Sequence, residues 1–73
     1  MTHQIFWASK VPQKDDFGHP ICSIMYDAPT KMGPWAQMSH TSWLVYRKYD
    51  TLGIGKGQRY EKQDDGRWLK VEG

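Results

Sequence analysis

Residues 58–71 read QRYEKQDDGRWLKV, and this stretch carries the clearest structural signal in the chain. Two β-compatible runs, Gln58–Gln63 and Arg67–Val71, flank the sequence Asp64-Asp65-Gly66. Asp-Gly between two such runs is a strong hairpin signal, because glycine accepts the positive φ angle that the turn requires. We therefore predict a β-hairpin in the C-terminal third of the chain.

A two-residue loop at Asp65-Gly66 would fix which side chains share a face of this hairpin. One face then carries Tyr60, Lys62, Leu69 and Val71. The other face carries Arg59, Glu61, Trp68 and Lys70. This register places Trp68 among charged side chains, either as an aromatic at an interface or as a cover over an earlier strand.

Working back toward the N-terminus, hydrophobic alternation over Ile5–Val11 predicts a first strand. The run His19–Tyr26 predicts a short second strand, and the turn-forming residues Asp27–Pro34 predict a loop after it. In the segment Ser39–Tyr49, Ser39 or Thr41 would cap a short helix, although the β-rich centre leaves a strand as the alternative.

The length of 73 residues and the hydrophobic share of 38% indicate one small domain, residues 1–73, and exclude a cofactor-binding domain. We predict an α+β fold, β-rich, with the C-terminal hairpin and one short helix. So short a chain needs another source of stability, such as a metal ion or a homodimer. The single cysteine, Cys22, excludes an internal disulfide and suits a reducing compartment.

Neither a membrane span nor a signal peptide is apparent in the sequence, so we expect a cytoplasmic protein with no membrane partner. The formal net charge is only +2. Seven of the ten basic residues lie in the last 27 residues, where acidic residues are interleaved with them. This pattern is typical of a mixed, solvated surface, with a phosphate-facing patch as the alternative. Aromatic residues make up 14% of the chain, and we expect at least one of the four tryptophans at a contact surface.

The segment Leu52–Gln58 has glycine at every second position. It matches neither the Walker loop nor the dinucleotide fingerprint. We interpret it as a tight connection in which glycine permits positive φ or the close approach of another backbone. A backbone anion site helped by Lys56 is the alternative.

No residue pair has the spacing of a catalytic site, so we expect that the protein is not an enzyme. Cys22 and His19 lie three positions apart, which places them on opposite sides of a strand. The adjacent acids Asp15-Asp16 and Asp64-Asp65 lie in polar turns, where carboxylates are usually solvated. The spacing His19-x-x-Cys22, however, is that of a zinc knuckle, and His40 follows further along the chain.

The GPWA segment of residues 33–36 and the strings GQxY and DGRWxKVEG, starting at Gly57 and Asp65, resemble a group of small phage and prophage proteins of unknown function. The resemblance covers about residues 19 to 73. It implies a zinc-ribbon-like fold, in which one C-x-x-C pair precedes GPWA and a second follows the methionine.

Carried over to this chain, the first pair falls on His19 and Cys22 and the second on Ser39 and Ser42. Only Cys22 matches, and serine is a poor zinc ligand, so the resemblance implies a degenerate zinc-ribbon-like domain with no cofactor. The alternative is a zinc ion held by His19, Cys22, His40 and a fourth donor such as His3 or an acid. Without zinc, its stabilisation must come from extra aromatics such as Trp43 or from a dimer.

The leading functional hypothesis is a non-enzymatic phage accessory protein in the bacterial cytoplasm. Such a protein would bind and occlude a host protein or ribonucleoprotein, for example a CRISPR-type defence complex. The alternatives are a nucleic-acid-binding module and a structural subunit of a phage particle. We expect partner binding on the hairpin, with one loop anchor: Trp68, Arg67, Lys70, Arg59, Tyr60 and Trp35.

Overall fold

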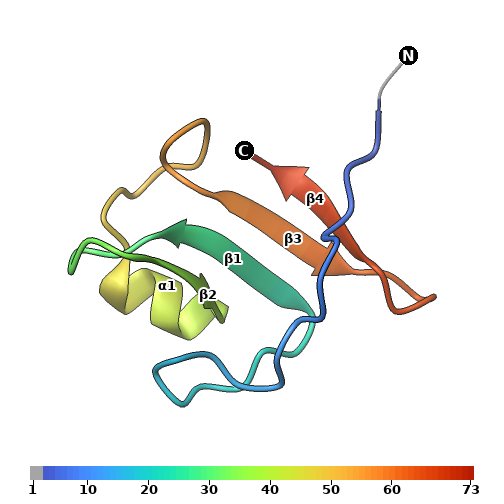
Figure 1. Ribbon diagram of the computed structural model, residues 1–73, viewed down its shortest axis with the longest axis horizontal. Coiled ribbons are helices and arrows are strands. Elements are labelled where there is room, and N and C mark those ends of the chain that lie inside the picture. Colours follow the sequence, from blue (N-terminus) through green and yellow to red (C-terminus); the bar gives the residue numbers. More distant parts are fainter. Residues whose placement is uncertain (1–2) are drawn as a thin grey trace.

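The structure is a computed structural model that describes residues 3–73, and it contains a four-stranded antiparallel sheet and one helix (Figure 1). The strands are β1 (Ile24–Pro29), β2 (Trp35–Met38), β3 (Gln58–Lys62) and β4 (Trp68–Glu72). The helix is α1 (His40–Tyr46). The strand order is β2-β1-β3-β4, so β1 and β3 are central. The predicted α+β, β-rich class with a C-terminal hairpin is confirmed, whereas its zinc-ribbon-like character stays a prediction.

The helix begins at one of the two predicted caps, and the alternative of a strand in this segment is wrong. Ser39 is the N-cap, and its hydroxyl accepts a hydrogen bond from the Ser42 backbone N–H at 3.2 Å. This bond satisfies one of the free N–H groups of the first turn, which offsets the β-favouring residues at the helix centre. The helix ends at Tyr46, because Arg47 has extended backbone angles.

The two faces of the sheet carry separate hydrophobic clusters. On one face Tyr26, Ala28 and Met38 pack with Trp43 of α1. On the other face Met25 and Tyr60 pack with Ile21, and residues from the N-terminal segment and β4 cover them. The sheet is therefore the middle layer between α1 and the N-terminal segment, and burial on both faces contributes most of the stability of so short a chain.

The hairpin forms, but its predicted register is wrong. Lys62 pairs with Trp68 and Glu61 pairs with Leu69. The Gln63 backbone N–H donates to the Arg67 carbonyl, and Gly66 lies at φ +88°, so three residues close the loop. A shift of one residue turns the side chains of Trp68, Leu69 and Lys70 to the other face relative to β3, and the irregularity between Arg59 and Tyr60 ends this shift before the pair Arg59–Glu72. Trp68 therefore shares a face with Tyr60 and packs on the core.

The predicted strand Ile5–Val11 is also wrong for most of its length. Only Phe6 forms a bridge, with Leu69 on the outer edge of β4. Backbone hydrogen bonds from Trp7 to Trp68 and from Lys70 to Ile5 flank this bridge. The chain bends at Ser9 and leaves the sheet, so the alternation reflects the burial of Trp7 and Val11 rather than a continuous strand.

The region predicted as a short strand and a long loop instead forms β1 and β2. Strand β1 starts at Ile24 and continues through Asp27 to Pro29, so the predicted loop Asp27–Pro34 is wrong at its start. Pro29 is tolerated because the pairing of β1 with β3 ends at Asp27, so the N–H that proline lacks is not needed for that ladder. The turn is confined to residues 30–34, where the Thr30 N–H donates to the Pro34 carbonyl. The strand β2 was not predicted.

The glycine-rich segment is a tight connection, as predicted. Gly57 has φ +124° and packs directly on β1, where an added Cβ would lie 2.5 Å from the Cβ of Ala28. Any larger residue at this position therefore collides with the central strand. Gly53 and Gly57 also pair across the loop, which brings β3 back alongside β1.

Candidate binding surface

The two aromatic residues predicted as anchors on the hairpin serve the core instead. Tyr60 is buried with Met25 and lies edge-on to Trp7, with ring centroids 5.3 Å apart. Burial and the nearby Asp27 carboxylate raise the pKa of the Tyr60 hydroxyl. Trp68 is half-buried against the same cluster. Neither ring is presented as a free anchor.

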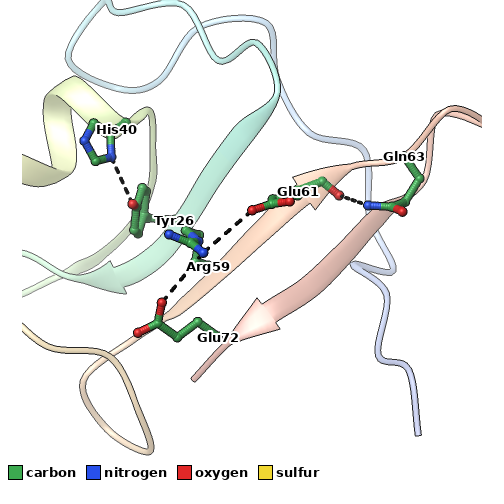
Figure 2. A network of polar contacts seen from close by, with 6 residues as sticks. All are labelled: Tyr26, His40, Arg59, Glu61, Gln63 and Glu72. Carbon is green, nitrogen blue, oxygen red and sulfur yellow. Dashed lines mark hydrogen bonds and ion pairs between the residues drawn. The ribbon is translucent and has the colours of Figure 1, made fainter. Parts of the chain in front are cut away.

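The two predicted arginines of the hairpin are neutralised by acids. Figure 2 shows Arg59 between Glu61 and Glu72, at nitrogen–oxygen distances of 3.6 and 3.8 Å. Arg67 pairs with Asp65 at 2.8 Å and lies 4.1 Å above the ring of Phe6. The interleaving of acids seen in the sequence therefore becomes pairing in space.

The two other predicted binding residues are Lys70 on the hairpin and Trp35, and they lie in different surroundings. Lys70 is half-buried, and its backbone N–H donates to the Ile5 carbonyl. Trp35 opens β2 beside Pro29, and 48% of its surface is exposed. Trp35 is thus the tryptophan that fits the expectation of an exposed ring.

Three basic residues gather around the end of β1, where Trp35 also lies. The Lys31 N–H donates to the Tyr46 carbonyl at 2.8 Å, and the Lys48 N–H donates to the Pro29 carbonyl at 3.0 Å. Arg47 forms a bridge with Thr30. In Figure 1 this is the end of the molecule where α1 finishes and the β1–β2 turn meets the loop that leads to β3.

Each of these cations lies over an aromatic ring. The Lys31 ammonium is 5.9 Å from the ring centroid of Tyr46, and the Lys48 ammonium is 5.5 Å from that of Tyr49. The Arg47 guanidinium lies 4.7 Å above Trp43. Cation–π contacts hold a charge in place without neutralising it.

No acidic residue occurs between Asp27 and Asp50, so Lys31, Arg47 and Lys48 belong to an acid-free stretch. Within residues 3–73 none of the three takes part in an ion pair. Exposed apolar side chains accompany them, since 54% of Met32 and 39% of Tyr49 are accessible. We call the following set the basic–aromatic surface: Lys31, Met32, Trp35, Arg47, Lys48 and Tyr49.

A buried polar network lies elsewhere, where the N-terminal segment meets the start of α1. The Asp15 carboxylate is 6% exposed and accepts hydrogen bonds from the backbone N–H groups of Phe17, His19 and Ser39 at 2.9 to 3.0 Å. Burial raises the pKa of Asp15, but hydrogen bonds from the Ser42 hydroxyl and from the Ser39 and His19 backbones outweigh it and lower the pKa to about 2.

Ser42 joins this network from the first turn of α1. Its hydroxyl lies 2.6 Å from His19 Nδ1, and its side chain is fully buried. The network fastens the loop of residues 13–20 to the helix.

The predicted metal ligands His19, Cys22 and His40 are not brought together. Among residues 3–73, no three His, Cys, Asp or Glu side chains are grouped so as to hold a metal ion. His40 Nδ1 is hydrogen-bonded to the Tyr26 hydroxyl at 2.9 Å (Figure 2), and Cys22 is exposed beside a shallow pocket of about 190 Å³.

The positions that the resemblance assigns to the second ligand pair carry Ser39 and Ser42, which contact Asp15 and His19 in the buried network. One exposed thiol and two hydroxyls do not form the tetrahedral set that a structural zinc ion requires.

Comparison with models of known protein families, with curated proteins and with solved structures yields no match for this chain. The resemblance to phage and prophage proteins therefore stays a prediction. No helix in the described part of the chain is long and apolar enough to cross a membrane.

Five of the six residues of the basic–aromatic surface were not predicted as a site; Trp35 alone was. The sequence did contain one usable signal, the acid-free stretch between Asp27 and Asp50. Counting basic residues along the chain pointed instead to the hairpin. What matters for binding an anion is the number of cations that lack an acidic neighbour, and that number favours the end of β1.

Proposed function

We propose that this protein is a non-catalytic binding protein that occludes a surface of a host macromolecule, as a phage accessory protein directed against a bacterial defence complex would do. The partner is a protein or a ribonucleoprotein in the cytoplasm of the bacterial host. The basic–aromatic surface makes the contact.

The observation that carries this proposal is the exposure of Trp35 next to Met32 at the end of β1. Tryptophan is enriched among the residues that dominate binding energy, because its ring buries a large area at a small entropic cost. A small domain gains stability by burying such a ring, as it does with Trp43 and Trp68. An exposed Trp35 therefore suggests burial against a partner.

The experiment is affinity purification of the tagged chain from bacterial cells, followed by reconstitution with the purified partner on a size-exclusion column. We expect the wild-type chain to co-elute with the partner and to inhibit its activity in proportion to the bound fraction. Trp35→Ala should reduce the affinity by at least tenfold, which corresponds to about 1.4 kcal/mol of binding energy.

The matched control is Ile5→Ala, because Ile5 is also about half exposed but lies on the opposite edge of the sheet. This variant should bind like the wild type. Equal loss in both variants, or no loss in Trp35→Ala, would contradict the proposed surface. Multiple turnover of any substrate by the purified chain would contradict a non-catalytic role.

A further inference from the structure

We infer that the basic–aromatic surface binds single-stranded nucleic acid, with phosphates at Lys31, Arg47 and Lys48 and unstacked bases on the exposed rings of Trp35 and Tyr49. This inference rests on the proposed function and specifies it, because it assigns the contact to the nucleic-acid component of the partner.

The charge of the surface favours a phosphate backbone. Three cations lie within a stretch that contains no acid, while the other seven basic residues share the remainder of the chain with all eight acidic ones. Backbone hydrogen bonds fix the main chain of Lys31 to Tyr46 and that of Lys48 to Pro29, and the three charged groups lie over aromatic rings. A cation that is positioned and not neutralised is suited to release counterions from a polyanion.

The aromatic residues of the surface favour single strands over duplexes. Trp35 lies in β2, where it pairs with Pro29. Tyr49 follows Lys48, whose backbone N–H donates to the carbonyl of the same Pro29. Both rings are exposed, with 48% and 39% of their surface accessible. Every base has a π-face, so such rings bind unpaired bases of any sequence.

The surface consists of the β1–β2 turn, the first residue of β2 and the residues that follow α1. Cations and rings that flank such a turn can follow a flexible single strand.

The experiment measures fluorescence anisotropy of labelled oligo(dT) and oligo(U), each of about 15 nucleotides, with the purified full chain. Three phosphate contacts predict a slope of log K against log salt concentration of about −2 on single strands, which is a loss of roughly 15- to 20-fold between about 50 and 200 mM salt. Duplex DNA of equal length should bind more weakly, because it presents no free bases.

The variants separate charge from stacking. The double variant Lys31→Ala/Lys48→Ala should make the salt slope less steep, from about −2 to about −0.7. Lys62 is an exposed lysine on the hairpin, and Lys62→Ala should leave the slope unchanged. Trp35→Ala and Tyr49→Ala should each weaken binding by about fivefold or more without changing the slope. Circular dichroism confirms that each variant is folded.

Three outcomes overturn the inference. The first is the absence of oligonucleotide binding at low salt, the second is equal binding of duplex and single strand, and the third is a salt slope that responds to Lys62→Ala instead. Stronger binding of a poly-glutamate peptide would identify an acidic protein as the partner. If the reconstituted complex still forms after nuclease treatment while oligonucleotides do not bind, the inference fails and the proposed function stands.

Discussion

Asp15→Asn should lower the free energy of unfolding by about 2 to 3 kcal/mol at neutral pH. The pKa of Asp15 falls from its ordinary value of 3.8 to about 2 in the folded chain, because hydrogen bonds to the ionised carboxylate outweigh its burial. Each pKa unit between the folded and unfolded states corresponds to about 1.4 kcal/mol of stability. The asparagine amide cannot carry the charge, so this contribution is lost.

The difference in stability between wild type and Asp15→Asn should depend on pH. A carboxyl group with a lowered folded-state pKa contributes its stability above the unfolded-state pKa and loses it as the pH falls through the folded-state pKa. For Asp15 that window extends from about pH 4 down to about pH 2. Urea unfolding followed by tryptophan fluorescence should therefore show a difference between wild type and Asp15→Asn that narrows across this window.

The control for this prediction is Asp16→Asn, since Asp16 is the neighbouring residue and its side chain is exposed. An exposed substitution of this kind should change the stability by no more than about 0.5 kcal/mol. Equal stability of Asp15→Asn and Asp16→Asn would contradict the role of the Asp15 carboxylate. So would a loss of unfolding free energy in Asp15→Asn that is the same at pH 2 as at pH 7.

The remaining predictions concern packing and are measured by thermal and urea unfolding. Trp43→Ala should lower the free energy of unfolding by about 3 to 5 kcal/mol and leave the chain largely unfolded, because Trp43 is 7% exposed and stacks on Tyr26 with ring centroids 4.4 Å apart. An unchanged melting temperature would contradict this role of Trp43. Gly57→Ala should cost about 2 to 4 kcal/mol from positive φ and collision with β1, whereas Gly55→Ala, with positive φ but open space, should cost about 1 kcal/mol. Trp68→Ala should reduce stability by about 2 kcal/mol or more, because the ring packs on the core; loss of binding with unchanged stability would restore the hairpin as the binding site.

Local signals in the sequence indicated the hairpin and favoured the helix over a strand, although they did not give the hairpin register. Ser39 caps the helix through its own side chain, and Asp-Gly closes the hairpin, so both depend on residues close in sequence. The strand β2 and the end of β1 were missed because Asp27 and Pro29 favour turns locally. Pairing with neighbours on both sides overrides that preference at Asp27.

The candidate site was harder to predict, because a difference of one residue in a loop changes which side chains face outward. The hairpin loop contains one residue more than predicted, and this alone moves Trp68 from the charged face to the core. Pairing of acids with Arg59 and Arg67 is likewise a property of the folded hairpin. Trp35, predicted as an anchor in a loop, is exposed but is the first residue of the strand β2.

Nuclear magnetic resonance can locate the binding surface residue by residue. Titration of the isotope-labelled chain with oligo(dT) should shift the backbone amides of residues 30–33, 35–36 and 46–49, which surround the end of β1. The amides of residues 59–70 on the hairpin should stay in place. Shifts confined to the hairpin would contradict the account, and so would an unchanged spectrum at low salt.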